Sequence, residues 1–379
     1  MKSRKIRQVA FNLHQYIGLV VGLLLIIVGL TGSLLVFQHE IDQFLVQRQF
    51  GQVIPQQQRV SIESVLNTVK TAYSDRPDLK LNSIDTHSEN NVYKVRFFAS
   101  DDKRTEVFVN SYTGKILGDR IWDNALIGVT YKLHYALLAG RTGEIIVGIA
   151  ALLLLILSIT GIVLWSGWRK LISGFRIKWR SHPKRVNFDI HKVAGIITAI
   201  FLAFTAFTGF CWNFYDVAEP AIYAITLTPN PAKPVSMPVA GKSPLGISQI
   251  IQTADAALPG AETTYINLGR KPEDAIAVYK KRPQELNEYG DSAVYLDRYS
   301  GKILKLQDGS NLSLGDKVLN SFSPLHYGTF WGLPTRILYI FVGISPLILA
   351  ITGYALWWYR YRGKVSSPID TNDTAKHRL

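Results

Sequence analysis

Four of the eight histidines in this chain of 379 residues flank long apolar runs, in two matched pairs. His14 and His191 each begin a His-x-x-x-Gly pattern, and His134 and His326 each lie within a Leu-His-Tyr triplet. Two imidazoles that face each other on neighbouring helices supply the axial ligands of six-coordinate haem iron. Zinc is a competing use, but each pair supplies two ligands where a structural zinc site takes four. A histidine at a membrane boundary can also act only as a hydrogen-bonded interfacial residue.

Other polar side chains near these pairs are weaker candidates. His39 lies at the far end of the first apolar run and could ligate a metal, but the matching position in the second half is an aspartate, which favours a surface or hydrogen-bonding role. Arg141 and Arg336, near the Leu-His-Tyr pair, could hold haem propionates, as could Arg7 and Lys192 near the other pair. Basic residues at a membrane boundary also commonly extend to the membrane surface without such a role.

Long helices must carry these histidines. Four runs without Asp, Glu, Lys or Arg, roughly 17–37, 145–165, 193–214 and 337–357, each reach the roughly 20 residues that cross about 30 Å of hydrocarbon. With 47% hydrophobic and 18% charged residues, the chain is predicted to be a membrane protein. The basic residues before the first run resemble the start of a signal peptide, but the run is long and lacks a cleavage site, so we expect it to be retained.

Basic residues concentrate in three short segments, the N-terminus, the 166–192 connection and the tail after Trp357. These segments hold seventeen Lys and Arg residues against three Asp, which accounts for the formal net charge of +14. Because Lys and Arg near span ends favour the cytoplasmic side, both termini are predicted to be cytoplasmic. The charge therefore reports topology, and no basic patch interleaved with aromatic residues indicates a nucleic-acid partner. The single cysteine, Cys211, excludes a disulfide framework and a cysteine-based metal site.

The two halves of the chain repeat the same spacing. In the first and third runs a histidine precedes a Thr-Gly pair by seventeen residues, and in the second and fourth by twenty-six. An even number of spans separates the halves, so the repeat is predicted to be parallel, with a pseudo-two-fold axis along the membrane normal. The four motifs are His14 with Thr31-Gly32, His191 with Thr208-Gly209, His134 with Thr160-Gly161 and His326 with Thr352-Gly353.

The two long connections read as folded α+β domains outside the membrane. Each has a helix-like run followed by alternating strands and a turn with a Gly-Lys pair. The expected elements are a helix from Ser61, strands at 92–97 and 106–109 and a turn at 113–117, then a helix after Ser248, strands at 275–279 and 293–296 and a turn at 300–304.

The predicted fold is an α-helical membrane protein with four transmembrane helices in a duplicated parallel repeat, plus two extracytoplasmic α+β domains. The predicted order is a cytoplasmic N-terminus at 1–16, a span at 17–37, a first outer domain at 38–142, a span at 143–165, a cytoplasmic basic loop at 166–190, a span at 191–214, a second outer domain at 215–334, a span at 335–358 and a cytoplasmic tail at 359–379.

With these motifs, the sequence resembles the PepSY-associated transmembrane family, also called iron-regulated membrane proteins, which includes inner-membrane ferric-siderophore reductases. The resemblance covers nearly the whole chain and rests on the two His-x-x-x-Gly openings, the two Leu-His-Tyr triplets, the Thr-Gly endings and the two Gly-Lys turns. It implies that the outer domains are PepSY-like, that the protein lies in the bacterial inner membrane and that it binds two haem b groups.

The function that the resemblance implies is electron transfer across that membrane. One haem would lie between His14 and His191 and the other between His134 and His326, and the acceptor would be Fe(III) held by a siderophore outside. Such a protein would be a haem-dependent ferric-siderophore reductase that releases Fe(II) for uptake. No flavin- or nicotinamide-binding domain follows the fourth span, so the expected donor is a separate cytoplasmic reductase or a quinol.

Two other functions stay open. The outer domains could bind peptides or regulate a protease while the spans serve as anchors, although an anchor has no use for four symmetric histidines. A siderophore or small-solute permease is the other alternative, but a permease would normally show charged or broken helices at mid-membrane, and here Pro346 alone interrupts a span.

Overall fold

The computed structural model describes residues 2–87, 90–239 and 241–365, so the end of the predicted cytoplasmic tail lies outside the described residues. The chain forms two compact units. The helical unit comprises residues up to 34, 133–213 and those from 337 onward, and the sheet unit comprises 35–132 and 214–336. Each unit therefore draws on both halves of the sequence.

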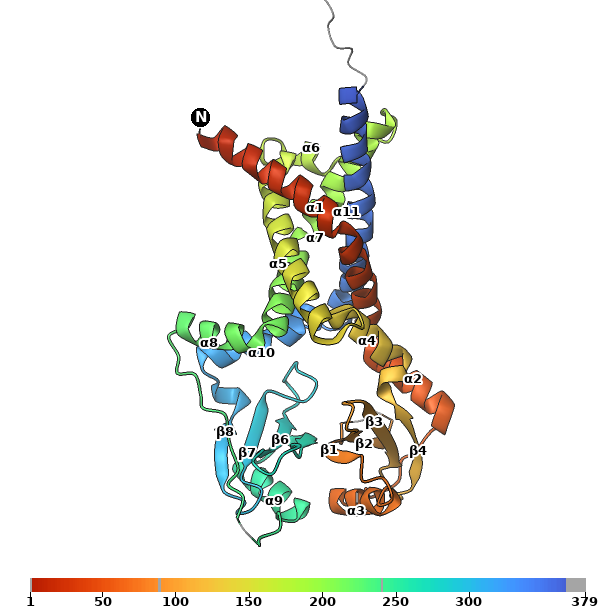
Figure 1. Ribbon diagram of the computed structural model, residues 1–379, viewed down its shortest axis with the longest axis vertical. Coiled ribbons are helices and arrows are strands. Elements are labelled where there is room, and N and C mark those ends of the chain that lie inside the picture. The colour runs from red at the N-terminus through yellow and green to blue at the C-terminus, as the bar shows by residue number, and fades with distance from the viewer. Residues whose placement is uncertain (1, 88–89, 240, 366–379) are drawn as a thin grey trace, which may run out of the picture. The chain divides into compact units, whose positions relative to one another are not determined.

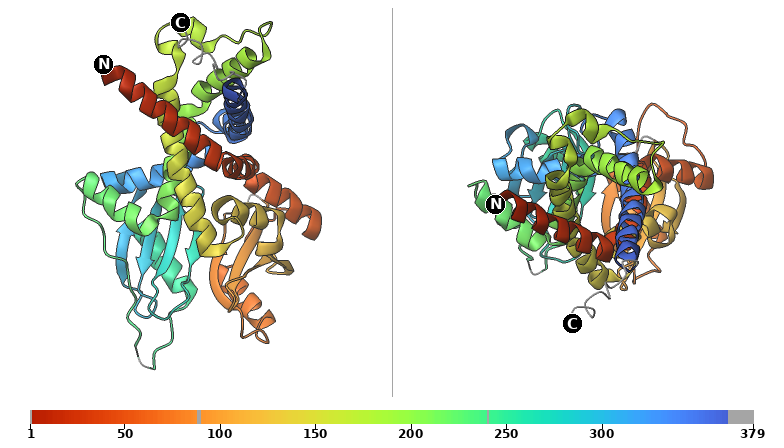
Figure 2. Two further views of the ribbon diagram at one scale, coloured as in Figure 1. Left: turned by 45° about the horizontal axis from the view of Figure 1, so that its top comes forward. Right: turned by 90° about the horizontal axis from the view of Figure 1, so that it is seen from above.

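The helical unit contains the long apolar helices that the sequence predicts. Its main elements are α1 (Lys2–Leu35), α5 (Gly140–Leu164), α7 (Pro183–Asn213) and α11 (Leu333–Val365), joined on one side by η2 (Ser166–Trp168) and α6 (Leu171–Phe175). Four candidate spans, Arg4–Leu35, Gly140–Trp168, Pro183–Asn213 and Leu333–Arg362, are long and apolar enough to cross a membrane, which confirms the four predicted spans. Helices α5 and α7 run alongside each other (Figures 1 and 2).

Helices α1 and α11 approach closely because small residues meet where they cross. A Cβ on Gly29 would lie 2.4 Å from the Gly343 carbonyl oxygen, so only glycine fits there. Ser33 donates a hydrogen bond to the Ile340 carbonyl across the same crossing, at 3.0 Å. Pro346 interrupts α11 by removing one N–H group, but the Ser345 hydroxyl donates to the Val342 carbonyl that proline leaves without its helical partner. The helix therefore continues through the proline.

The sheet unit contains eight strands and several short helices. The strands are β1 (Lys80–Asp85), β2 (Val92–Phe98), β3 (Arg104–Asn110), β4 (Ile116–Ile121), β5 (Glu262–Asn267), β6 (Ile276–Lys281), β7 (Ser292–Leu296) and β8 (Ile303–Gln307). The helices are α2 (Gln38–Phe50), α3 (Ile62–Ala72), η1 (Trp122–Asn124), α8 (Tyr215–Ile225), α9 (Ile247–Ala257), η3 (Gly309–Asn311) and α10 (Leu314–Tyr327). One further helix, α4 (Leu126–Ala136), begins in the sheet unit and ends in the helical unit.

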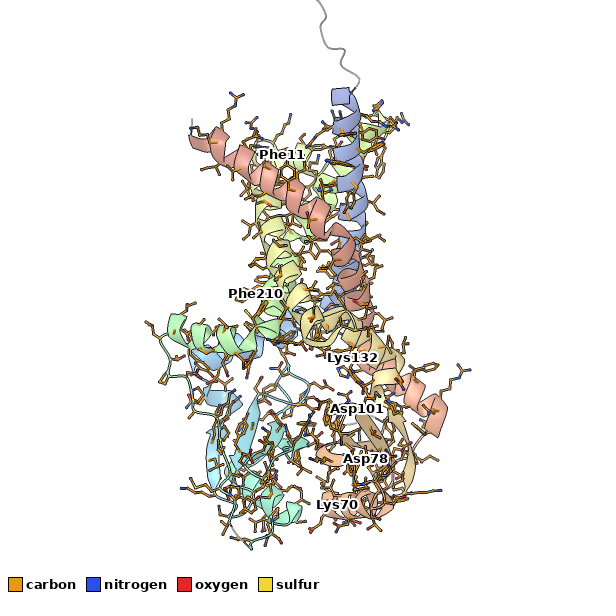
Figure 3. All side chains as sticks on the ribbon, in the orientation of Figure 1. Phe11, Lys70, Asp78, Asp101, Lys132 and Phe210 are labelled. Carbon is orange, nitrogen blue, oxygen red and sulfur yellow. The ribbon has the colours of Figure 1, made fainter. Side chains whose placement is uncertain are left out.

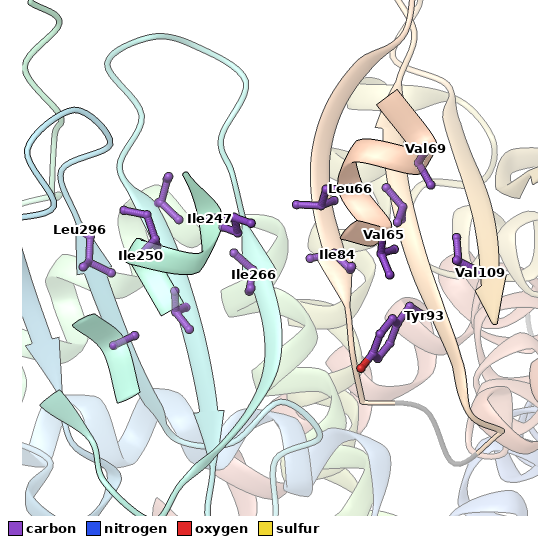
Figure 4. Packing of buried hydrophobic residues seen from close by; sticks show 14 of the residues in the cluster. Val65, Leu66, Val69, Ile84, Tyr93, Val109, Ile247, Ile250, Ile266 and Leu296 are labelled. Atoms are coloured by element: carbon purple, nitrogen blue, oxygen red, sulfur yellow. The ribbon is translucent and has the colours of Figure 1, made fainter. Parts of the chain in front are cut away.

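All eight strands form one antiparallel sheet in the order β4-β3-β2-β1-β5-β6-β7-β8. The two chain segments meet where β1 pairs with β5, with Ile84 opposite Ile266. Both isoleucines are fully buried, and they join the core residues of α3 and α9 in one hydrophobic cluster (Figure 4). The sequence predicted two separate α+β segments, and the junction that makes them one sheet was not foreseen.

Local signals explain the predicted elements that the structure confirms. Ser61 caps α3 because its hydroxyl accepts a hydrogen bond from the Ser64 N–H at 3.2 Å. The predicted turns form where Gly114 and Gly301 adopt φ values of 70° and 72°, which favour glycine. Helix α9 begins at Ile247 with Gly246 as its N-cap, two residues earlier than the Ser248 signal suggested.

A buried cluster of ions ties α2 to the sheet. The Glu106 carboxylate on β3 is 1% exposed and lies 2.7 Å from Arg120 and 3.1 Å from Arg104. Arg120 also contacts both oxygens of Asp42 on α2, at 2.8 Å each. Burial raises the pKa of Glu106, but the surrounding Lys and Arg charges outweigh burial and lower it from 4.5 to about 2.

Replacing Glu106 with glutamine should destabilise the sheet unit by about 3–5 kcal/mol, because it leaves buried arginines without their counter-charge. The folded pKa lies below the unfolded value of 4.5, so the carboxylate stabilises the fold above pH 4.5 and loses this effect as pH falls toward 2. Melting curves of the full-length protein in detergent, followed by circular dichroism, should therefore show a difference between wild type and variant that shrinks with acidification.

The matched control is Asp78→Asn, which breaks an exposed ion pair with Arg76 and should leave the melting temperature unchanged. If the Glu106→Gln protein melts at the same temperature as the wild type at neutral pH, the ion cluster does not stabilise the sheet unit.

Candidate functional site

A cavity of about 550 Å³ lies among the four long helices of the helical unit. His14 on α1 and His191 on α7 both line it. Their ring centroids are 6.1 Å apart and their planes lie at 87° to each other. The structure therefore brings together the His-x-x-x-Gly pair that the sequence singled out.

A threonine on a neighbouring helix holds each of these imidazoles. His14 Nδ1 lies 2.9 Å from Thr160 Oγ1 on α5, and His191 Nδ1 lies 2.8 Å from Thr352 Oγ1 on α11. Each hydroxyl donates its one hydrogen to a backbone carbonyl of its own helix, Ile156 at 2.7 Å or Ile348 at 2.6 Å. The hydroxyl can then only accept from the ring, so Nδ1 carries the proton and the lone pair is on Nε2. Nε2 is the nitrogen that a metal ion in the cavity would use.

The glycine after each threonine leaves space for the ring. A Cβ on Gly161 would lie 3.3 Å from Cε1 of His14, and a Cβ on Gly353 would lie 3.5 Å from Cε1 of His191. The first distance is tighter than ordinary van der Waals contact and the second is ordinary. Each Thr-Gly pair thus combines a hydrogen-bond acceptor with room for the imidazole that it holds.

The arrangement fits a planar metallocofactor with two axial imidazoles. Two imidazole nitrogens that bind one metal ion from opposite sides, each at about 2 Å, put the ring centroids roughly 6 Å apart. The observed 6.1 Å agrees with this separation. The volume lies within the range of about 300–1,000 Å³ found for cofactor and ligand sites. Leucines from all four helices form much of the wall, among them Leu25, Leu154, Leu157, Leu202 and Leu349.

Basic residues border this cavity. Arg7 donates to the Leu164 carbonyl at 3.0 Å, and Arg360 donates to Gln15 at 2.8 Å. Arg360 also lies 4.5 Å from the centre of the ring of Phe11, a residue of α1 that Figure 3 labels. Both arginines line the cavity, and a guanidinium group suits the carboxylate groups of a cofactor. Lys192 also lines it, but its ammonium is held by Asp189 and two backbone carbonyls.

His134 is held in the same way as the first pair. Its Nδ1 lies 2.9 Å from the Val28 carbonyl and 3.2 Å from Thr31 Oγ1 on α1. A carbonyl only accepts, so Nδ1 is again protonated and the lone pair is on Nε2. A Cβ on Gly32 would lie 3.0 Å from the ring, which makes this Thr-Gly pair the tightest of the three. His326 lies on α10 in the sheet unit, and its pairing with His134 stays a prediction.

The weaker candidates lie in ion pairs. Arg141 contacts Glu144 at 2.8 Å in the helical unit, and its side chain is mostly exposed. Arg336 binds both oxygens of Glu40 in the sheet unit and lies 4.2 Å from the Phe37 ring centre. These contacts engage both guanidinium groups, and their role toward a propionate stays a prediction.

His39 pairs with Glu288 at 3.1 Å. Burial lowers the pKa of His39, but the hydrogen bond and charge of Glu288 outweigh burial and raise it. Across residues 2–87, 90–239 and 241–365, no group of three or more His, Cys, Asp and Glu side chains is arranged to hold a metal ion. The contact between His39 and Glu288 is a hydrogen bond, the kind of role that the sequence favoured for His39.

Sequence reasoning found the threonines but not their partners. It placed each Thr-Gly pair after the histidine of the same run, whereas His14 bonds Thr160 and His134 bonds Thr31, each on another helix. Spacing along one span does not show which helix lies beside it, so the sequence carries no signal for these partners. Arg360 was missed because it lies in a tail rich in basic residues.

Comparison with protein families identifies a family that covers most of the chain. The family model described as PepSY-associated TM region matches residues 11–360, which is most of the chain and includes all four candidate spans apart from their outermost residues. A comparison with curated proteins finds no match.

With haem as the ligand that the sequence predicts, Thr352→Val should weaken its binding. The change keeps the shape of the side chain but removes the acceptor for His191 Nδ1–H, and loss of such an outer hydrogen bond typically costs about 10–100-fold in metal affinity. The measurements are the haem-to-protein ratio after purification and the midpoint potential of the haem that remains.

Thr198→Val is the matched control, since Thr198 is a buried threonine on α7 whose hydroxyl donates to the Ala194 carbonyl. Equal haem retention and equal potentials in the two variants would contradict the assignment of Thr352 as a positioning residue.

Proposed function

The chain belongs to the PepSY-associated TM family, and on that premise we propose that it is a di-haem electron-transfer protein of the bacterial inner membrane that reduces ferric siderophores outside the cell membrane. The observation that carries the proposal is the pair of His14 and His191, 6.1 Å apart, with both Nδ1 protons fixed by threonines. Two neutral imidazoles with their lone pairs on Nε2 are the ligand set of a low-spin haem iron.

The residues of the chain would hold two haem groups. His14 and His191 would bind the inner one, and His134 with His326 would bind the outer one. A bound b-type haem supplies reversible one-electron redox chemistry, which no side chain in the site provides by itself. The leucine walls exclude water and lower the local dielectric, and Arg7 and Arg360 would neutralise propionates at the cavity border.

We infer a duplicated origin of the two halves, which would supply two sites. Each half supplies a helix, then four antiparallel strands, and the strand order of the sheet reads the same from either end. In each half, a histidine near the start of a long helix bonds the threonine of a Thr-Gly pair on the next long helix of that half. The repeat would make the outer segments PepSY-like domains of one shared sheet.

The direction of the chain in the membrane follows from its charges. The basic N-terminus, loop and tail are proposed to lie in the cytoplasm, so that the sheet unit lies outside. The chain would then carry one electron at a time from a cytoplasmic reductase or a quinol to Fe(III) held by a siderophore. Each electron converts one Fe(III) to Fe(II), which binds hard oxygen ligands more weakly and is released.

Absorption spectra of the purified protein, oxidised and dithionite-reduced, test the haem sites. The wild type should contain two haem groups per chain with a six-coordinate spectrum, and His14→Ala or His191→Ala should remove one of them. His134→Ala or His326→Ala should remove the other.

His182→Ala is the matched control, because His182 lies in the loop before α7 and accepts a backbone hydrogen bond from Lys184. It should retain both haem groups. Full haem content after His191→Ala, or loss of both groups from any single change, would contradict two independent bis-histidine sites.

Mixing the reduced protein with a ferric siderophore and a chromogenic Fe(II) chelator tests the reaction itself. The wild-type protein should be reoxidised and should release one Fe(II) for each electron that it loses. The haem-depleted His191→Ala protein should be reoxidised and release Fe(II) more slowly. Reoxidation without release of Fe(II) would exclude ferric reduction and leave the haem sites intact.

A further inference from the structure

The sheet unit contains its own polar cavity, of about 500 Å³. It lies between α2 and the face of the sheet formed by β2 and β3, and it is also bordered by α10 and the β6–β7 connection. The volume suits a small organic ligand. Its lining includes five carboxylates and five Lys or Arg side chains, an unusual density of charge for an enclosed space.

Each carboxylate of this cavity already has an arginine or histidine partner. Glu40 binds Arg336, Asp42 binds Arg120, Asp85 binds Arg96, Glu106 binds Arg104 and Glu288 binds His39. These five pairs use every acidic side chain that lines the cavity. The partner in each pair is an arginine or His39, and His39 carries a charge only when it is protonated. Neither lysine is the principal partner of a carboxylate in these pairs.

Lys94 and Lys281 add positive charge to the lining beyond these five pairs. Lys94 on β2 reaches Asp42 only at 3.5 Å, and that carboxylate already binds Arg120 through both oxygens. Lys281 on β6 donates to the Glu288 backbone carbonyl at 3.3 Å. Both lysines line the cavity, and their charge favours an anionic ligand.

The environment of Arg104 also favours an anionic ligand in this cavity. Burial lowers the pKa of Arg104, and attraction to Glu106 does not restore it because the nearby Arg96 adds repulsion. Its Nε atom is buried without a hydrogen-bond partner. An anion in the cavity would relieve both conditions.

Aromatic rings form part of the wall. Trp122 and Tyr131 pack edge to face with ring centroids 5.8 Å apart, and Arg104 lies 3.6 Å from the Trp122 ring centre. Both rings and Arg104 line the cavity. A ligand that is both anionic and aromatic would match the lysines and this wall together.

We propose that this cavity binds a trivalent metal ion held in an anionic chelate of the kind that catecholate ligands form, with Lys94 and Lys281 attracting its charge and Trp122 and Tyr131 contacting its rings. The proposal rests on the proposed function and names the class of siderophore that the protein would accept. Neutral chelates of the hydroxamate kind lack the charge that the cavity is built to attract.

Gallium(III) complexes test binding apart from electron transfer, because gallium(III) has the charge and ligand preference of Fe(III) but is not reduced under these conditions. The full-length holoprotein in detergent is titrated calorimetrically with a hexadentate tricatecholate complex and with a neutral hexadentate trihydroxamate complex. The catecholate complex should bind at least tenfold more tightly, and its affinity should fall as salt is added.

Lys94→Gln combined with Lys281→Gln should weaken binding of the catecholate complex by roughly tenfold or more and flatten the salt dependence. Asp42 and Glu106 keep their arginine partners in this variant, so we expect the fold to be retained. Lys305→Gln is the matched control. Lys305 also lies on a strand with its ammonium 5.5 Å from a tyrosine ring centre, as Lys94 lies 5.9 Å from Phe108, but it does not line the cavity.

Equal binding of the two gallium complexes, absence of binding, or equal loss in the Lys305→Gln control would overturn the proposal. None of these results changes the haem content of the protein, so none of them contradicts the proposed electron-transfer function. Absence of haem from the wild-type protein would instead contradict the proposed function, whether or not the gallium complexes bind.

Discussion

The hydrogen bond from a histidine Nδ1–H to a threonine hydroxyl on a neighbouring helix is the interaction on which the helical unit's site depends. The threonine hydroxyl donates its hydrogen to a backbone carbonyl of its own helix, so it can only accept from the histidine. The histidine–threonine hydrogen bond therefore fixes the tautomer of the imidazole as well as the orientation of the ring. Because histidine and threonine come from different helices, the tautomer is correct only when the helices are packed. Packing of the helices therefore also sets the histidines in the tautomer that a metal ion would bind.

Packing of the same helices explains the glycines. Gly161 and Gly353 make room for the imidazoles, and Gly29 allows α1 and α11 to touch through their backbones. In a membrane, where apolar side chains gain little from leaving lipid, such close contacts and interhelical hydrogen bonds supply much of the association energy. The residues that bring the helices together are thus neighbours of the residues that would bind a cofactor.

Much of this arrangement could be predicted from the sequence. Uncharged runs of sufficient length define the four spans, and equal spacings select the four histidines. The threonine partners could not be assigned, because spacing along one helix says nothing about which helix lies beside it. Strands β1 and β5 were missed because their buried positions include Ser83, Asp85 and Thr264, which break the apolar alternation that marks a strand. The shared sheet depends on those polar strands, because β1 and β5 form its junction.

An electron paramagnetic resonance spectrum of the oxidised full-length protein tests the central claim most directly. The 87° angle between the His14 and His191 rings predicts the highly anisotropic low-spin ferric signal that perpendicular axial imidazoles produce. That signal should be present in the wild type and absent from His191→Ala. A spectrum with high-spin iron alone, or with no haem iron in protein expressed with ample haem, would contradict the account.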